Sequence, residues 1–194
     1  DVVCRVAALY TTNKFPAAPI IVSRERTKTG TARGLIVNSG NANACTGARG
    51  IQDAREMTTL AAYELGVQEK HILVASTGVI GRYMPMDKIR AGIPQCIASL
   101  SKEGGIDAAD AIMTTDTRKK HFSLSFELDG KKCTIGAIAK GSGMINPTMA
   151  TTINILPTDV AITSARLKTA LCEAVRISLI ALSVDGTMTT NDCI

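Results

Sequence analysis

The amino-acid sequence predicts a layered sandwich of the α/β or α+β class. Short apolar segments that end in Gly- or Asn-rich turns alternate with longer segments whose apolar residues recur at helical spacing. One further segment alternates apolar and polar residues and ends in an Asp-Gly pair, which is typical of a β-hairpin. A chain of 194 residues is long enough to bury a core in one large domain or two small ones.

Two strands, each followed by a helix, are predicted in the first half of the chain. Leu35–Asn38 and Ile72–Ala75 are the short apolar runs. Between them, a helix from Ile51 to Leu65 is predicted by a stripe of apolar residues at helical spacing. Asp87 is expected to cap the next helix, which Pro94 should kink or interrupt.

A hairpin and two helices are predicted in the second half. Asp107 should cap a short helix that ends near Met113. The alternation from Phe122 to Leu128 predicts a half-buried strand that returns, after Asp129–Gly130, along Cys133–Ala139. The last helix is expected to begin with Ser164 and to turn apolar residues inward, at Leu167, Leu171, Val175 and Leu182. No repeat or long linker interrupts the sequence, so we expect one domain over residues 1–194.

The composition excludes several classes of function. Apolar residues make up 45% of the chain but occur in short runs, so no membrane span or membrane partner is expected. Aromatic residues are only 3%, which argues against a stacking platform for nucleic acid. The first residues lack the layout of a secretory signal, and we expect a cytoplasmic protein, or a mitochondrial one in a eukaryote. The net charge of +5 is scattered and is compatible with small anionic substrates.

The cysteines and histidines do not predict a metal site. No C-x-x-C occurs and there are only two histidines, so buried free thiols in a reducing compartment are the expected state. Cys45 could be a nucleophile, but no histidine partner is evident. The six cysteines are Cys4, Cys45, Cys96, Cys133, Cys172 and Cys193.

Common cofactor and hydrolase motifs are also absent. Gly141 and Gly143 could open a dinucleotide loop, but Asn146 occupies the place of the third glycine. Neither Ser39 nor Ser76 lies in a G-x-S-x-G turn. With so few histidines, an acyl-transfer enzyme of this sequence would need a different base.

The most informative segment is Lys140–Thr151, which reads KGSGMINPTMAT. A lysine beside tightly turning backbone can hold a carboxylate, although such segments are often loops with a proline turn. The Thr151 hydroxyl is a weak nucleophile and needs activation. Cutting the preceding bond would free its α-amino group, which titrates near about 8 and could accept a proton.

This segment resembles the self-cleavage segment of the bifunctional glutamate N-acetyltransferase, or ornithine acetyltransferase, family (the ArgJ family of arginine biosynthesis). Further stretches resemble the family in the same order. The family differs from this chain at Thr148, Ile180–Ala181 and Thr187, and it also has a short N-terminal piece and a large C-terminal part that the chain lacks. The other matching stretches are Thr11–Pro19, Asn38–Gly47, Ser76–Gly81, Ile112–Thr117 and, more loosely, Val184–Asp192.

The resemblance implies an α/β/β/α sandwich of the ornithine acetyltransferase type, self-cleaved between Ala150 and Thr151. Residues 1–150 would belong to the first chain, and residues 151–194 would begin the second. The two chains would stay together, and a higher oligomer is expected.

The resemblance also implies the reaction and its residues. Acetyl would pass from N2-acetylornithine to glutamate through an ester on Thr151, with no cofactor, and some family members also use acetyl-CoA as donor. Thr77 and Gly78 would stabilise the oxyanion, and Thr114, Lys140 and Thr151 would bind substrate. Two alternatives remain open: a self-processing amidase or aminopeptidase that uses water as acceptor, and an uncleaved, non-catalytic binding protein.

Overall fold

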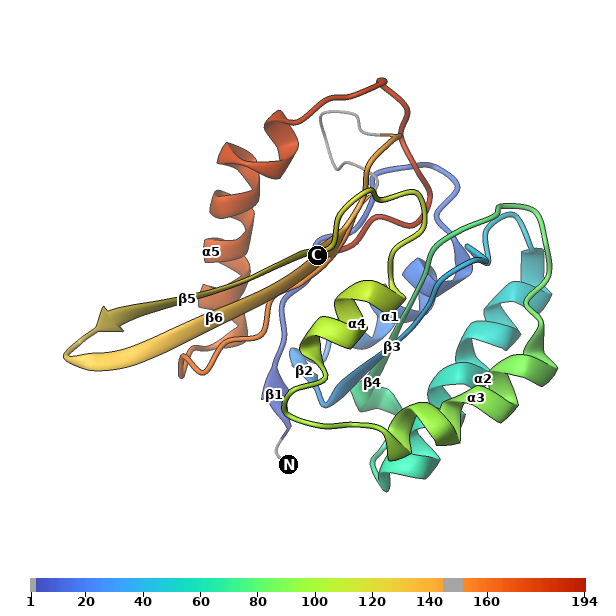
Figure 1. Ribbon diagram of the computed structural model, residues 1–194, viewed down its shortest axis with the longest axis horizontal. Helices are drawn as coiled ribbons and strands as arrows, with labels where there is room; N and C mark the ends of the chain where they lie inside the picture. Colours follow the sequence, from blue (N-terminus) through green and yellow to red (C-terminus); the bar gives the residue numbers. More distant parts are fainter. Residues whose placement is uncertain (1–2, 145–151) are drawn as a thin grey trace.

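The computed structural model describes residues 3–144 and 152–194. Across the view of Figure 1 the elements follow one another as helices α2 and α3, strands β3 and β4, the β5–β6 hairpin and helix α5. This order corresponds to the predicted α/β/β/α arrangement, and the mixed α/β class is confirmed. Within the described residues, no helix is long and apolar enough to cross a membrane.

A parallel strand pair lies at the centre of the helical part. β3 (Gly34–Asn38) pairs with β4 (Ile72–Ser76), so that Asn38 and Ser76 stand opposite each other at the carboxyl ends of the strands. α2 (Gly47–Leu65) connects the two strands, as a parallel pair requires a crossover. The short helix η1 (Glu69–His71) leads into β4. The strands confirm the predicted ones within one residue at each end.

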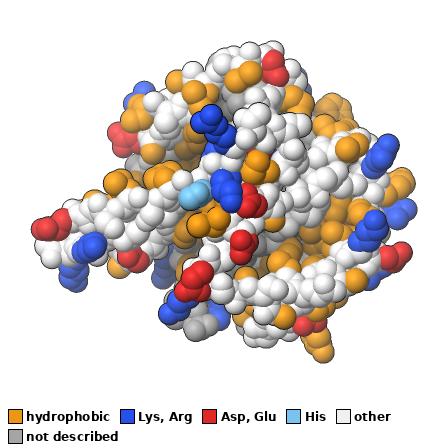
Figure 2. All heavy atoms as spheres, in the orientation of Figure 1, with side chains coloured by type: hydrophobic (Ala, Val, Ile, Leu, Met, Phe, Trp, Pro, Cys, Tyr) orange, Lys and Arg blue, Asp and Glu red, His pale blue; other side chains and the backbone are white. Residues whose placement is uncertain are grey.

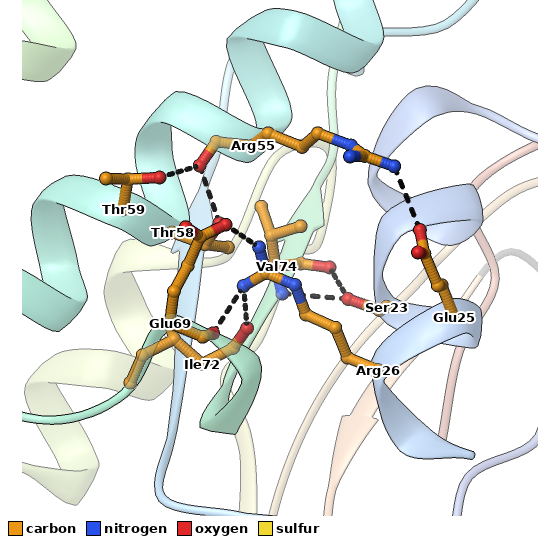
Figure 3. Close-up of polar contacts among 9 residues, drawn as sticks. All are labelled: Ser23, Glu25, Arg26, Arg55, Thr58, Thr59, Glu69, Ile72 and Val74. Atoms are coloured by element: carbon orange, nitrogen blue, oxygen red, sulfur yellow. Dashed lines mark hydrogen bonds and ion pairs between the residues drawn. The ribbon is translucent and has the colours of Figure 1, made fainter. Parts of the chain in front are cut away.

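Helix α1 (Ala18–Thr27) lies beside β4 and satisfies its backbone (Figure 3). The Ser23 hydroxyl donates to the Val74 carbonyl at 2.6 Å and accepts from the Val74 N–H at 2.8 Å. Arg26 donates to the carbonyl of Ile72 at 2.6 Å. Buried backbone groups are costly when unpaired, so these side chains take the place of a neighbouring strand.

The main core lies between this strand pair and helices α1, α2 and α3 (Met86–Ala98). Its largest fully buried side chains include β-branched residues of β4 and long apolar residues of the helices, which interdigitate as a close-packed interior requires. The buried members of this core are Ala18, Val22, Ala54, Met57, Ala61, Ala62, Ile72, Val74, Met84, Met86 and Ile93.

The predicted hairpin is present, but its burial was predicted wrongly. β5 (Lys120–Leu128) and β6 (Lys131–Lys140) pair in antiparallel fashion around Asp129–Gly130, where both residues have positive φ as a tight hairpin turn demands. Phe122 and Leu124 are more than half exposed. Figure 2 shows apolar side chains at the surface of the projecting hairpin, with acidic and basic side chains interspersed over the same view.

The end of the chain joins three distant segments. β7 (Ile153–Ile155) pairs with the end of β6. Residues 192–194 run beside it, where the N–H of Cys193 donates to the carbonyl of Thr152 at 3.0 Å. On the other side, the N–H of Thr11 donates to the carbonyl of Asp192 at 2.9 Å.

A short antiparallel strand pair, β1 (Cys4–Arg5) with β2 (Thr31–Ala32), lies near the start of the chain.

Two predicted helix starts were wrong. α3 begins after Pro85, and α4 (Gly105–Ala111) begins after Gly104, so that Asp87 and Asp107 lie inside the first turns. A carboxylate in the first turn is still favourable because it faces the positive end of the helix dipole.

Pro94 does not interrupt α3, contrary to the expectation of a break. Proline removes one backbone donor, but the neighbouring Ile93 is buried in the main core. Tertiary packing therefore holds the helix through a residue that would end an isolated one.

The last helix, α5 (Ser164–Ile177), begins at Ser164 as predicted, and the hydroxyl of the preceding Thr163 caps it by accepting the N–H of Arg166. Val175 is buried as predicted. Leu182 lies beyond the helix and the following η2 (Leu179–Ala181), and it is exposed, so its predicted inward position was wrong.

The turns after β3 and β4 approach each other at Gly78. Its φ is +131°, and a Cβ built there would lie 2.3 Å from the carbonyl carbon of Gly40. The N–H of Val79 donates to the carbonyl of Gly40 at 3.3 Å, and the N–H of Ala42 donates to the carbonyl of Val79 at 2.9 Å. Only glycine allows this approach at this backbone angle.

We therefore expect Gly78→Ala to destabilise the fold strongly. Gly81→Ala is a matched control, because Gly81 also has a positive φ, of +80°, but has open space around its Cβ direction. The control should cost about 1–2 kcal/mol for the backbone alone, and Gly78→Ala should cost more than about 3 kcal/mol. Urea unfolding of both variants measures the difference, and equal costs would contradict the close approach.

Candidate functional site

Three of the predicted site residues meet at one buried ammonium group. Lys140 ends β6 and is only 4% exposed. Its Nζ donates to the hydroxyl of Thr77, directly after β4, and to the hydroxyl of Thr114, after α4, at 2.8 Å each. These partners are 63 and 26 residues away in the sequence, so the fold itself brings the predicted residues together.

The direction of these hydrogen bonds is fixed by chemistry. An ammonium group can only donate, so both hydroxyl oxygens act as acceptors. The hydroxyl protons of Thr77 and Thr114 are therefore directed away from Lys140 and are available for another acceptor. Gly78 follows Thr77 at the close turn already described.

The ammonium of Lys140 is held without a carboxylate in direct contact among the described residues. Burial lowers the pKa of Lys140, and the nearby carboxylate of Asp116 acts in the opposite direction. Lys120 adds to the lowering, and Asp192 opposes it. A buried cation whose direct partners are neutral hydroxyls is well placed to pair with an anionic group of a ligand.

Asp116 links two of the matching stretches and was not singled out from the sequence. Its Oδ1 accepts the N–H of Gly141 at 2.7 Å and the ammonium of Lys120 at 2.6 Å. Its Oδ2 accepts the N–H of Thr114 at 3.4 Å. Burial acts to raise the pKa of Asp116, but the hydrogen bonds from Lys120 and the two backbone groups outweigh it, and the pKa is lowered. Asp116 thus remains a carboxylate that fixes both the Thr114 turn and the chain after Lys140.

Asp192 is a second buried carboxyl group that was not singled out. It is 1% exposed, and its Oδ1 accepts the N–H of Thr152 at 3.1 Å and the hydroxyl of Thr189. Its Oδ2 is buried with no hydrogen-bond partner in the part of the chain that the structure describes. Burial is the main cause that raises the pKa of Asp192 to about 7.

The segment before Asp192 connects the remaining stretches. Asn191 donates through Nδ2 to the carbonyl of Ala42 at 2.7 Å and to the carbonyl of Ser76 at 2.8 Å. The hydroxyl of Thr11 donates to the carbonyl of Thr189 at 2.7 Å. The stretches that resemble the ArgJ family therefore converge on one region. The only sequence signal for Asp116 and Asp192 was their position inside two of these stretches.

The remaining predicted site residues, Ala150 and Thr151, lie outside the described residues, as does Thr148. The roles assigned to Thr77, Gly78, Thr114 and Lys140 stay predictions, although their positions are now known.

Cys133 is buried and Cys193 is partly buried, but the other four cysteines are exposed, so the expectation of buried thiols was wrong for most of them. Cys45 is exposed. Among residues 3–144 and 152–194, no group of three His, Cys, Asp or Glu side chains could hold a metal ion.

The buried Asp192 makes stability depend on pH. With its pKa raised from the usual value to about 7, the folded state binds more protons than the unfolded state between about pH 4 and pH 7. Stability should therefore fall as pH rises through this range. Asp192→Asn should remove this fall and be more stable than the wild type at pH 8, by on the order of 2–4 kcal/mol, and nearly equal to it at pH 4. Urea unfolding at the two pH values measures this difference; a constant difference would contradict the raised pKa.

Comparison with known proteins places the chain in a family. A model of the ArgJ family matches residues 1–194. The arginine biosynthesis bifunctional protein ArgJ of Symbiobacterium thermophilum is 51% identical over 191 residues, which cover 98% of this chain and 48% of the relative. The protein of the same name from Caldanaerobacter subterraneus is 49% identical, over 96% of this chain and 46% of the relative. The chain thus spans about half the length of the curated relatives it matches.

Two solved structures with similar folds support the same family. The crystal structure of arginine biosynthesis bifunctional protein ArgJ from Bacillus halodurans is 42% identical, with a TM-score of 0.70 over 78% of each chain. The structure of ornithine acetyltransferase from Mycobacterium tuberculosis in complex with ornithine is 32% identical, with a TM-score of 0.65 over 76% of this chain and 77% of that one. The converging stretches, the family match and these structures together establish that the chain belongs to the ArgJ family.

Proposed function

We propose that the complete protein transfers the acetyl group of N2-acetylornithine to glutamate. The observation that carries this proposal is the buried ammonium of Lys140 between the hydroxyls of Thr77 and Thr114. Both substrates are amino acids with an α-carboxylate, the kind of anion that such a group can pair with. The similarity to ArgJ proteins of arginine biosynthesis, and to an ornithine acetyltransferase solved with ornithine, supports the same substrates.

The proposed nucleophile is Thr151, released by self-cleavage that separates residues 1–150 from a chain that begins at residue 151. The Thr151 hydroxyl attacks the carbonyl carbon of Ala150, the C–N bond between the two residues breaks, and the hydroxyl proton passes to the nitrogen. Water then hydrolyses the resulting ester. The products are a carboxylate on Ala150 and a free hydroxyl and amine on Thr151.

Acetyl transfer would use the same hydroxyl twice. The freed amine takes its proton, and the oxygen attacks the acetyl carbonyl of N2-acetylornithine. The amide C–N bond breaks, the proton passes to the departing amine, and ornithine leaves an acetyl ester behind. The neutral amine of glutamate then attacks the ester, and its proton returns to the Thr151 oxygen as N-acetylglutamate forms.

Thr77 and Gly78 are proposed to stabilise the negative oxygen of both tetrahedral intermediates. The Thr77 hydroxyl oxygen already accepts a hydrogen bond from Lys140. The Thr77 O–H group is therefore free to donate to the negative oxygen of the intermediate. The backbone N–H of Gly78 would be the second donor. Removal of one such donor typically lowers turnover about 10²–10³-fold.

Thr151→Ala in the complete precursor should leave a single uncleaved chain, because the attacking hydroxyl is missing. Thr152→Ala is the matched control, since it removes a neighbouring hydroxyl while keeping the backbone N–H, and it should still be cleaved. Intact mass measures the outcome; cleavage of the Thr151→Ala precursor would exclude this nucleophile.

Acetyl transfer to labelled glutamate, measured beside the release of free acetate, then tests the reaction. Transfer supports the proposal, and release of acetate alone would indicate a self-processing amidase. An intact wild-type precursor without activity would indicate a binding protein.

Lys140→Met in the complete protein should weaken binding of both N2-acetylornithine and glutamate, because one charge-assisted hydrogen bond to the α-carboxylate is lost. The expected loss is about 1.5–3 kcal/mol, or about ten- to a hundredfold in affinity. Lys140→Arg should rescue binding only in part, because a planar guanidinium places its donors differently. Cleavage before Thr151 should persist in both variants, since it needs no external carboxylate. Calorimetric binding gives the measurement, and unchanged affinities would place the carboxylate site elsewhere.

A further inference from the structure

Asp192 makes a contact directly after the proposed cleavage point. Its Oδ1 accepts the N–H of Thr152 at 3.1 Å. That N–H belongs to the peptide unit that joins Thr151 to Thr152, so the carboxyl group holds the bond that follows the proposed nucleophile. The carbonyl of Thr152 is held as well, because it accepts the N–H of Cys193 at 3.0 Å.

The second oxygen of Asp192 shows that this carboxyl group is not optimised for stability. Oδ2 is buried, and no described residue donates to it. A buried acceptor without a partner is costly, and native structures rarely keep one without a reason. The hydroxyl of Thr189 donates to Oδ1 and not to Oδ2.

We propose that Asp192 is a positioning residue for self-cleavage: it fixes the peptide unit after the cleavage point, and the charge on its carboxylate sets the pH at which cleavage proceeds. The proposal rests on the proposed function, because it takes the bond between Ala150 and Thr151 as the one that breaks. It assigns a role to a residue outside the predicted nucleophile, oxyanion and substrate positions.

The groups around Asp192 leave its charge free to change near neutral pH. From β6, Lys140 contributes a positive charge that favours the carboxylate. The adjacent Cys193 stays a neutral thiol, because its partial burial raises its pKa to about 12. The remaining contacts come from Thr152, Thr189 and Thr11 and carry no charge. Burial outweighs these contacts and keeps the pKa of Asp192 at about 7.

The ionised carboxylate is the active form in this proposal. A hydrogen bond from the N–H of Thr152 to a carboxylate is stronger than one to a neutral carboxyl group. The peptide unit is therefore held more firmly above pH 7 than below it. Cleavage should speed up as pH rises, in step with the ionised fraction of Asp192.

The test follows cleavage of the complete precursor, made in a short pulse of cell-free translation and shifted to buffers between pH 5.5 and pH 9. In the wild type, the rate should rise about tenfold between pH 6 and pH 8, as expected for a group that ionises near 7. Asp192→Asn should be about tenfold slower at pH 8 and independent of pH over this range, because an amide does not ionise.

Asp53→Asn is the matched control. Asp53 on α2 is also a buried carboxyl group whose Oδ2 has no hydrogen-bond partner among the described atoms, although Arg49 lies 4.0 Å from it, and burial raises its pKa. The charged groups that act on it, Arg49, Glu56 and Arg90, belong to α2 and α3 and not to the site. Asp53→Asn should therefore keep the wild-type pH profile.

Each outcome separates this inference from the proposed function. A wild-type rate that does not change between pH 6 and pH 8 overturns the role of Asp192, even if the Asn variant does not fold. The role of Asp192 is also overturned if the Asp192→Asn precursor keeps the wild-type change of cleavage rate with pH, whatever its absolute rate. The same holds if Asp53→Asn loses this pH dependence. A wild-type precursor that stays uncleaved at every pH, or a Thr151→Ala precursor that is cleaved, contradicts the proposed function itself.

Discussion

The burial of one positive charge, on Lys140, is the constraint around which the site is organised. An ammonium group removed from water must be given hydrogen-bond acceptors at close range. Thr77 and Thr114 provide them at 2.8 Å, and each comes from a different part of the chain. The carboxylates of Asp116 and Asp192 favour the charge from a greater distance. This arrangement keeps the cation in place and leaves it without a bound anion among the described residues.

The geometry of the turns makes this arrangement possible. Thr77 reaches Lys140 because β4 ends beside β3 and the two following turns lie in contact at Gly78 and Gly40. Asn191 ties the same turns to the end of the chain through the carbonyls of Ala42 and Ser76. The site therefore depends on segments that are far apart in the sequence, and no isolated part of the chain could form it.

The sequence predicted those features that depend on local patterns. The strands at residues 35–38 and 72–75 and the hairpin turn at Asp129–Gly130 could be read from short apolar runs and one Asp-Gly pair, because the forces that form them act between neighbours. The helix through Pro94 and the exposed Phe122 and Leu124 could not, because they depend on which distant element covers a face.

The same limit applied to the candidate site. Thr77, Thr114 and Lys140 were named through a family resemblance, and the structure brings them into contact. Asp116 and Asp192 were not named, although each fixes a segment of the site. Their importance rests on burial and on hydrogen bonds to backbone N–H groups, and neither property leaves a pattern in the residues beside them.

The contacts on the two sides of the proposed cleavage point explain how the site could survive a cut chain. Residues before it include Lys140 at the end of β6, and residues after it form β7, which pairs with β6. Gly136 of β6 donates its N–H to the carbonyl of Pro157 at 2.9 Å, beyond β7. The last residues, 192–194, are held on one side by Thr152 and Asn154 and on the other by Leu9 and Thr11.

Strand pairing and side-chain contacts thus join the segment 152–194 to the rest of the protein on both of its flanks. A break between Ala150 and Thr151 removes one covalent bond and none of these contacts. The two chains would remain associated, because sheet hydrogen bonds of this kind do not depend on chain continuity. The carboxylate of Asp192 would then hold the new chain through the N–H of Thr152, and the opposite charge of the Lys140 ammonium would favour its ionised form.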